Sequence, residues 1–176
     1  LCIPPLRQLS GNEHERLIQM LDWVIAADEK ADLFEFMLQH SLSKHLSDHF
    51  STGKEKSARR LTLPRGLPES GDTLLSLMAW NGRDGKGAAK AFKFAVERSS
   101  PFESWTPSLL SEDSINSEIV LEALAAFDGA APLIKKNILE MCGHAAAEDG
   151  VLTSNEAEIL RIVADGIGAA LPPFSS

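Results

Sequence analysis

Residues 153–167 read TSNEAEILRIVADGI, and this stretch indicates the fold class of the chain most clearly. Thr153 and Glu156 have the three-residue spacing of a capping box, in which two side chains satisfy the free backbone N–H groups at the start of a helix. Apolar residues then recur every three or four positions, which is the period of one helix face. The stretch therefore predicts a helix starting at Thr153, whose buried stripe is Ile159, Leu160, Ile162, Val163 and Ile167.

The same period runs through most of the chain, and strict two-residue alternation is almost absent. Ser10 with Glu13 and Asp32 with Glu35 form two more capping boxes, and Pro132 suits the first turn of a helix. We expect an all-α fold of about seven helices. The other six are predicted at residues 10–28, 32–46, 69–80, 88–97 and 117–127, and from Pro132 onward; glycine-rich residues 81–87 are predicted to break the helical pattern, and residues 99–116 to be irregular and held by Phe102 and Trp105.

A weak internal repeat relates the two ends of the chain. Residues 27–35 align with residues 148–156, and in both an Asp is followed seven positions later by a Glu that starts the next helix. We expect two similar helical hairpins that pack together in one bundle, because a lone hairpin leaves its apolar stripe in water. The predicted organisation is one domain, residues 1–176, with hairpin one at about 10–50, a linker at 51–68, middle helices at 69–127 and hairpin two at about 131–171.

Composition excludes several classes of protein. The 176 residues are 44% hydrophobic, which is too apolar for general disorder, and the net charge of -8 argues against binding to nucleic acid. No apolar run approaches the roughly 20 residues of a membrane-spanning helix. The chain begins with Leu1 and has no signal-peptide pattern, so we expect a soluble piece of a longer protein.

The acidic hairpin tips are the first candidate site. Asp28, Glu35, Asp149 and Glu156 carry the hard oxygen ligands that Ca²⁺ or Mg²⁺ prefers. The spacing is not that of an EF-hand, since Gly150, Val151 and Leu152, which follow Asp149, supply no side-chain oxygens. The other interpretation is that both Glu residues complete capping boxes and interact with the helix dipole.

The histidines provide no credible catalytic centre. His45, Asp48 and His49 have the spacing of an inverted zinc-protease motif, but Asp replaces the Glu that acts as general base, and no third ligand is evident. His14-Glu15 resembles the start of H-E-x-x-H, yet Ile18 stands at the second ligand position. His40, His144, Cys2 and Cys142 are expected to be ordinary structural or solvated residues. We therefore expect no enzymatic activity and no cofactor in this chain.

A basic stretch interrupts the acidic background. It contains Lys54, Lys56, Arg59, Arg60 and Arg65, with Glu55 as its one acidic residue. One interpretation is a solvated linker. The other is a contact with an anionic membrane surface or an acidic partner, because each basic residue near such a membrane contributes about 1 kcal/mol.

The two hairpins resemble the C-terminal extension of bacterial HtpX-like (CAAX-prenyl-protease-like) membrane zinc metallopeptidases, whose fold is TerB-like. The resemblance lies in residues 24–28, 32–36, 145–150, 156–161 and 171–173. It implies an accessory, docking or regulatory domain of a membrane-bound zinc metalloendopeptidase, on the cytoplasmic face of the bacterial inner membrane. The zinc and catalytic residues would lie in the preceding protease domain, which would itself be a partner, together with or instead of another protein.

Two alternatives stay open. One is a free-standing TerB-like module for metal sensing or stress response, in which acidic residues at helix ends are associated with metal binding. The other is a small zinc hydrolase built around His45 and His49.

Overall fold

A computed structural model of the chain describes residues 9–10, 12–13, 16–17, 19–20, 37, 66–102 and 105–171. The chain forms two compact units, residues 1–59 and 60–176, and the division falls within the predicted linker. In the first unit, Ser10 and Glu13 form the expected capping box: the Ser10 N–H and Oγ–H donate to Glu13 Oε2 at 2.8 and 2.7 Å. The described residues 12–13, 16–17 and 19–20 are helical.

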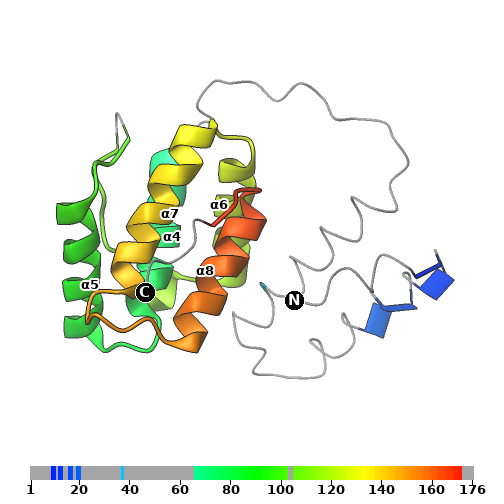
Figure 1. The fold of residues 1–176 in the computed structure, drawn as a ribbon, viewed down its shortest axis with the longest axis horizontal. Helices are drawn as coiled ribbons and strands as arrows, with labels where there is room; N and C mark the ends of the chain where they lie inside the picture. Colours follow the sequence, from blue (N-terminus) through cyan, green and yellow to red (C-terminus); the bar gives the residue numbers. More distant parts are fainter. Residues whose placement is uncertain are drawn as a thin grey trace. The chain divides into compact units, whose positions relative to one another are not determined.

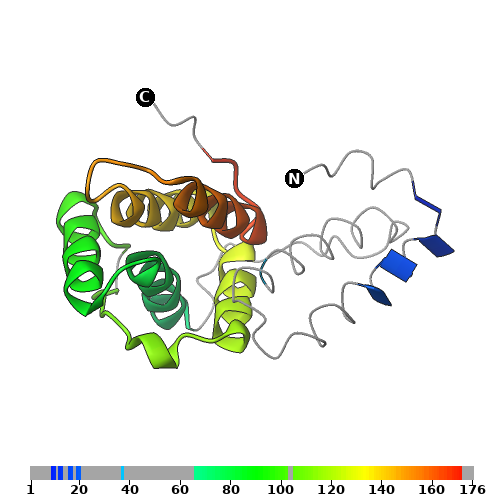
Figure 2. The same cartoon turned by 90° about the horizontal axis from the view of Figure 1, so that it is seen from below.

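The second unit is a bundle of helices arranged around α4 (Figures 1 and 2). Helix α4 packs against all of the other α-helices of the unit, and buried residues occur on every side of it. An apolar surface all round is what a central helix requires. The described part of the chain contains no strand, which confirms the all-α class there. The helices are α4 (Leu67–Trp80), α5 (Gly85–Arg98), α6 (Ser117–Asp128), α7 (Pro132–Ala146) and α8 (Ser154–Gly166), with a 3₁₀ turn at Glu112–Ser114.

Two predicted helix starts were wrong. Helix α5 begins at Gly85 and not at Ala88, because Asp84 is its N-cap and Asp84 Oδ1 accepts a hydrogen bond from the Gly87 N–H at 2.8 Å. Gly85 and Gly87 lie in the first turn, before the interior of the helix, so their flexibility costs less than expected. Helix α4 begins at Leu67, with Pro68 in its first turn, so the predicted linker at residues 51–68 extends two residues too far.

The aromatic side chains between α5 and α6 are fixed as expected. Trp105 is buried, stacks on Phe102 at a ring separation of 4.9 Å, and donates from Nε1 to Asp72 Oδ1 at 2.9 Å. Trp80 donates from Nε1 to the Leu110 carbonyl at 2.9 Å. The indoles of these two residues therefore bind the connecting segment to α4.

Helices α7 and α8 form the expected second hairpin. Pro132 is in the first turn of α7, and Thr153 and Glu156 form the complete capping box of α8. Asp28 to Glu35, the matching part of hairpin one, lies outside the described residues, so the superposition of the two hairpins and the single-domain organisation stay predictions. None of the helices described here has both the length and the hydropathy needed to cross a membrane.

Candidate functional site

A buried ion pair fixes the corner between α7 and α8. Arg83, in the turn between α4 and α5, donates from Nη2 to Glu156 Oε1 at 2.6 Å, and the two side chains are 12% and 7% exposed. The same nitrogen donates to the Ala146 carbonyl at 3.0 Å, and Nη1 donates to the Asn81 carbonyl at 3.3 Å. The guanidinium therefore joins the carboxyl ends of α4 and α7 to the amino end of α8, where carbonyl and N–H groups lack helical partners.

Two further contacts hold the same corner. Lys90 of α5 forms an ion pair with Glu148 at 2.6 Å, and Asn155 Nδ2 donates to Asn81 Oδ1 at 3.1 Å. The turn that joins α7 to α8 is thus bound both to α5 and to the α4–α5 turn. We expect a rigid corner, since hydrogen bonds from three directions restrict its backbone.

Gly168 determines the path of the chain after α8. It has a φ of 65°, and the Ala169 N–H donates to the Ala164 carbonyl at 2.9 Å in the pattern of a Schellman motif. The positive φ favours glycine, and a Cβ at Gly168 would also lie 2.8 Å from Asp128 Oδ1, so the carboxylate would have to shift. The motif turns residues 169–171 back alongside the hairpin.

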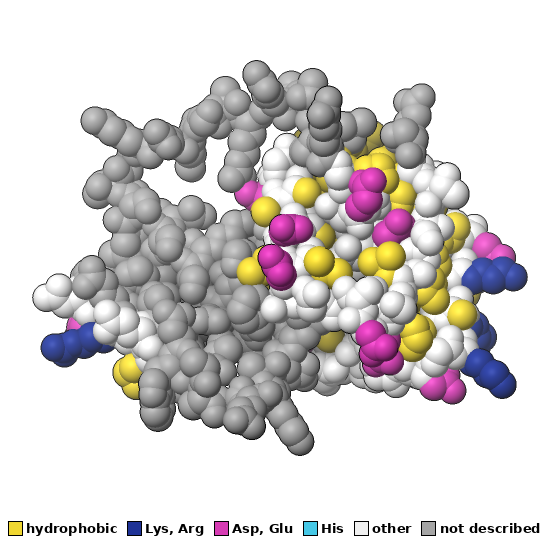
Figure 3. All heavy atoms as spheres, turned by 180° about the vertical axis from the view of Figure 1, so that it is seen from behind, with side chains coloured by type: hydrophobic (Ala, Val, Ile, Leu, Met, Phe, Trp, Pro, Cys, Tyr) yellow, Lys and Arg dark blue, Asp and Glu magenta, His cyan; other side chains and the backbone are white. Residues whose placement is uncertain are grey.

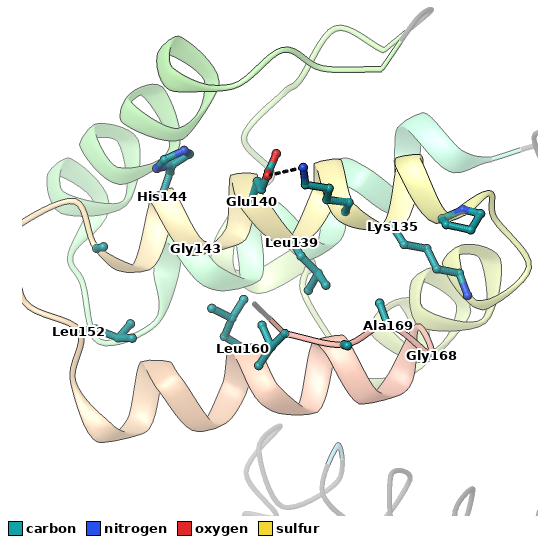
Figure 4. Close-up of a pocket in the computed structure, with 14 residues that line it drawn as sticks. Lys135, Leu139, Glu140, Gly143, His144, Leu152, Leu160, Gly168 and Ala169 are labelled. Atoms are coloured by element: carbon teal, nitrogen blue, oxygen red, sulfur yellow. Dashed lines mark ion pairs between the residues drawn. The ribbon is translucent and has the colours of Figure 1, made fainter. Parts of the chain in front are cut away.

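Helices α7 and α8, the turn between them and residues 168–171 border a groove of about 690 Å³, which we call the α7–α8 groove (Figure 4). Leu139 and Leu160 lie on its facing walls, Leu152 lies at the end nearest the α7–α8 turn, and Ala169 and Gly168 close the other end. A volume of this size is within the usual range for binding sites. Among the described residues, the lining consists of Pro132, Lys135, Lys136, Leu139, Glu140, Gly143, His144, Ala147, Leu152, Leu160, Gly168, Ala169, Ala170 and Leu171.

Among the described lining residues, the charged side chains all come from α7. Lys136 forms an ion pair with Glu140 at 3.4 Å, and both side chains are well exposed, at 67% and 48%. Lys135 extends toward Gly168, and His144 lies near the other end (Figure 4). The groove therefore combines aliphatic walls with a polar edge that carries more basic than acidic groups.

The predicted acidic residues of hairpin two have structural partners. Both oxygens of Glu156 are engaged, one by Arg83 and the other by Thr153 N and Oγ at 2.9 and 2.7 Å. Asp149 Oδ1 accepts a hydrogen bond from the Val151 N–H at 2.9 Å within the turn. The capping interpretation is therefore confirmed for Glu156. Among the residues that the structure describes, no group of three or more His, Cys, Asp or Glu side chains is placed to hold a metal ion.

The remaining sequence candidates lie outside the described residues. These are the acidic residues of hairpin one, the zinc-motif histidines and the basic stretch, namely Asp28, Glu35, His45, His49, Lys54, Lys56, Arg59, Arg60 and Arg65. Their proposed roles stay predictions.

His144 and Cys142 lie on different sides of α7. His144 lines the groove, whereas the Cys142 thiol is fully buried and donates to the Leu74 carbonyl at 3.7 Å. Burial raises the pKa of Cys142 to about 12, because a thiolate would have no water around it. Cys142 is therefore a core residue, which decides between the structural and the solvated role that the sequence left open.

A smaller cleft of about 260 Å³ lies between α4 and α6 and is lined by Glu69, Asp72 and Glu122. Figure 3 shows a face of the second unit on which acidic and hydrophobic side chains lie interspersed. Asp72 already accepts hydrogen bonds from Trp105 Nε1 and from the Ser108 N–H at 2.8 Å. Asp72 therefore has a structural role. Because the cleft is also smaller than the α7–α8 groove, the groove is the stronger candidate for a binding site.

The α7–α8 groove was not predicted from the sequence, although one of its residues carries a local signal. Gly168 directly follows the apolar stripe of α8, which is the common position for a helix-ending glycine. The ion pair between Arg83 and Glu156 gave no signal, because 73 residues separate the partners. No family model matches the chain, and no curated protein or solved structure is significantly similar to it. The resemblance to protease extensions accordingly rests on the short motifs alone.

Proposed function

We propose that the chain is a non-catalytic docking or regulatory domain that recognises another polypeptide through the α7–α8 groove. The groove is the observation that carries the proposal. Its walls include Leu139, Leu152, Leu160 and Leu171, and aliphatic walls favour binding by burial of apolar surface. The fixed corner at Arg83 and the turn at Gly168 hold the two ends of the groove in place, which lowers the entropy lost on binding.

The wider assignment rests on the sequence resemblance. In it, the chain is the accessory domain of a membrane-bound zinc metalloendopeptidase at the cytoplasmic face of the bacterial inner membrane. The catalytic zinc belongs to the protease domain, and the partner is that domain or a protein bound to it. A domain tethered in this way needs little intrinsic affinity, because attachment gives an effective concentration of roughly millimolar.

The first test compares the full-length gene product with a form that lacks residues 1–176. We expect unchanged zinc content but altered substrate turnover, assembly or localisation. If the deleted enzyme equals the intact one in all three, the accessory role is wrong. If the gene encodes no upstream hydrophobic segments and no H-E-x-x-H motif, the parentage is wrong and the free-standing TerB-like module replaces it.

The second test asks whether the docking role depends on the α7–α8 groove. Leu152→Asp places a charge on its half-buried lip, and Leu109→Asp is the matched control, since Leu109 is also half-buried in a loop but lies outside the groove. We expect Leu152→Asp in the full-length protein to reproduce the effect of the deletion and Leu109→Asp to leave function intact. Circular dichroism of both variants checks that they fold.

A further inference from the structure

We propose that the occupant of the α7–α8 groove is an amphipathic α-helix whose apolar stripe is flanked by acidic residues. This inference rests on the proposed docking function and names the class of partner. Three observations carry it: the length of the groove, the exposed apolar residues at its ends, and the charge along its edge.

The first observation is the shape of the groove. Along α7 its lining runs from Pro132 to Ala147, which corresponds to about 22 Å or four turns at 1.5 Å per residue. The wall opposite is formed by Leu160 of α8 together with Ala170 and Leu171, while Leu152 lies at one end and Gly168 and Ala169 at the other. An elongated apolar cleft between two elements is the geometry that accepts a helix with apolar residues at i, i+3, i+4 and i+7. Gly143 and Ala147 add little bulk to the α7 wall, so the backbone of a bound helix can approach closely.

The second observation concerns exposed hydrophobic side chains. Among the described residues of the second unit, the large hydrophobic side chains that stand exposed are Leu133, at 76%, and Val151, at 61%. Leu133 follows the lining residue Pro132 and itself lines a separate cleft with Phe102 and Ile134, whereas Val151 precedes the lining residue Leu152. Exposed apolar surface therefore lies beside both ends of the groove, where it can add contacts to a partner that extends past those ends.

The third observation is charge. In the part of the chain that the structure describes, the groove is lined by Lys135, Lys136 and His144 and by one acidic residue, Glu140, whereas the whole chain has a net charge of -8. Lys136 and Glu140 form an exposed ion pair, and such pairs contribute about 0–1 kcal/mol, so a partner carboxylate can replace Glu140 at little cost. The Lys135 ammonium lies beside Gly168 at the far end, where the Asp128 carboxylate also lies, so Lys136 is the cation that the edge offers to a partner. This local charge favours acidic residues beside the apolar stripe of the bound helix.

The experiment uses the 176-residue chain and three fluorescein-labelled peptides of about 18 residues. One has a Leu/Ala stripe flanked by Glu, the second has Lys in place of every Glu, and the third has the Glu composition in scrambled order. Fluorescence anisotropy at about 0.15 M salt gives the affinities, because long-range charge effects are then screened beyond about 8 Å. We expect the Glu peptide to bind at least tenfold more tightly than either of the others. The test is stringent, because the net charge of the whole chain favours the Lys peptide.

Variants then place the binding in the groove. Ala147→Trp fills the groove from the exposed end of α7, and Ala125→Trp is the control at an exposed position of α6. We expect the first to weaken the Glu peptide at least tenfold and the second to leave it unchanged. Lys136→Glu should reduce the preference for the Glu peptide over the Lys peptide. Leu171→Asp replaces Ala147→Trp should the latter fail to give the native helical spectrum.

Several outcomes overturn the proposal. Equal or tighter binding of the Lys peptide removes the charge argument, and equal binding of the scrambled peptide removes the helix. Binding of sodium dodecanoate or of phosphatidylglycerol vesicles that Ala147→Trp abolishes, with no helix bound, assigns the groove to a lipid instead. If the peptides fail while Leu152→Asp still impairs the full-length protein, the docking function stands with another occupant. If both fail, the docking function fails as well.

Discussion

The Arg83–Glu156 pair is the interaction with the largest expected effect on stability. Glu156→Ala leaves the Arg83 charge buried without a counter-ion and removes half of the capping box, so we expect a loss of about 3–5 kcal/mol in the free energy of unfolding. Urea unfolding measures it. Glu158→Ala is the control on the same helix, because the Glu158–Arg161 pair at 2.9 Å is solvent-exposed and its loss should cost about 0.5 kcal/mol or less.

A double variant checks the origin of that loss. Arg83→Met combined with Glu156→Ala should cost less than the sum of the two single variants, because no unpaired charge is left in the interior. If the two effects simply add, the ion pair is not what links the α7–α8 corner to α4.

Cys142 predicts a pH dependence. Its thiol keeps its proton in the folded chain up to a pKa of about 12, whereas in the unfolded chain it ionises near 9.0. Between these values the folded state holds more protons than the unfolded state, so stability falls as pH rises, by about 1.4 kcal/mol per pH unit at most. Urea midpoints at pH 8 and at about pH 10.5 measure this fall. Cys142→Ala should show a shallower fall, and identical slopes in the two proteins would contradict the prediction.

At the residue scale, what the sequence revealed was local. The Thr153–Glu156 capping box and Pro132 at the start of α7 depend on neighbours within one helical turn, so spacing alone predicted them. Arg83 pairs across 73 residues, and a polar side chain in a glycine-rich turn gives no sign of its partner. Sequence reasoning thus identified Glu156 and one of its two roles, and the structure added the other.

At the element scale, two glycines in helix interiors are expected to respond oppositely to the same substitution. A Cβ at Gly71 in α4 would lie 2.7 Å from Cζ2 of Trp105, whose indole is buried and hydrogen-bonded to Asp72. Overpacking of this kind costs about 1–3 kcal/mol, which exceeds the gain of about 0.8–1 kcal/mol that Ala gives in a helix. Gly71→Ala should therefore lower the urea midpoint.

Gly143 in α7 is the matched position. A Cβ there would lie 3.9 Å from Leu160 Cδ2, which is an ordinary contact. Gly143→Ala should therefore stabilise the chain by about 0.5–1 kcal/mol. Stabilisation by both substitutions to the same extent would mean that Trp105 is not fixed against α4.

Helix existence was predictable, but some helix starts were not. The apolar period correctly located α4, α6, α7 and α8, because each buries a stripe wide enough to be recognised. The predicted start of α5 was three residues too late. The glycines at positions 85 and 87 indicate a break in the helix, but the Asp84 carboxylate caps the helix before them. The groove depends on the packing of α7 against α8 and on residues 169–171, which turn back alongside these helices. Neither feature can be predicted from the sequence of one helix.

At the scale of the whole molecule, the central position of α4 has a visible signal. The run Leu74, Leu75, Leu77 and Met78 places apolar side chains on more than one face, and all four are buried. The order in which the other helices surround α4 has no such signal, because amphipathic stripes can pair in several ways. The expected count of about seven helices, the TerB-like fold and the packing of two hairpins extend into residues outside those described, so they stay predictions.

The last prediction is that residues 60–176 fold without residues 1–59. The buried residues of α4 pack against α5, α6, α7 and α8, all of which lie in this unit, and a domain of about 100 residues can bury enough surface to be stable alone. The fragment should show a helical circular dichroism spectrum and one cooperative urea transition. Leu74→Ala, at a fully buried position, should reduce its stability by about 2–5 kcal/mol.

The fragment also tests where recognition takes place. Every described residue that lines the α7–α8 groove lies between Pro132 and Leu171, so the folded fragment should bind the Glu peptide as tightly as the whole chain. A fragment without a cooperative transition would show that the second unit is not an independent domain. A fragment that folds but no longer binds the peptide would show that residues 1–59 take part in recognition, and hairpin one would then become the first region to test by substitution.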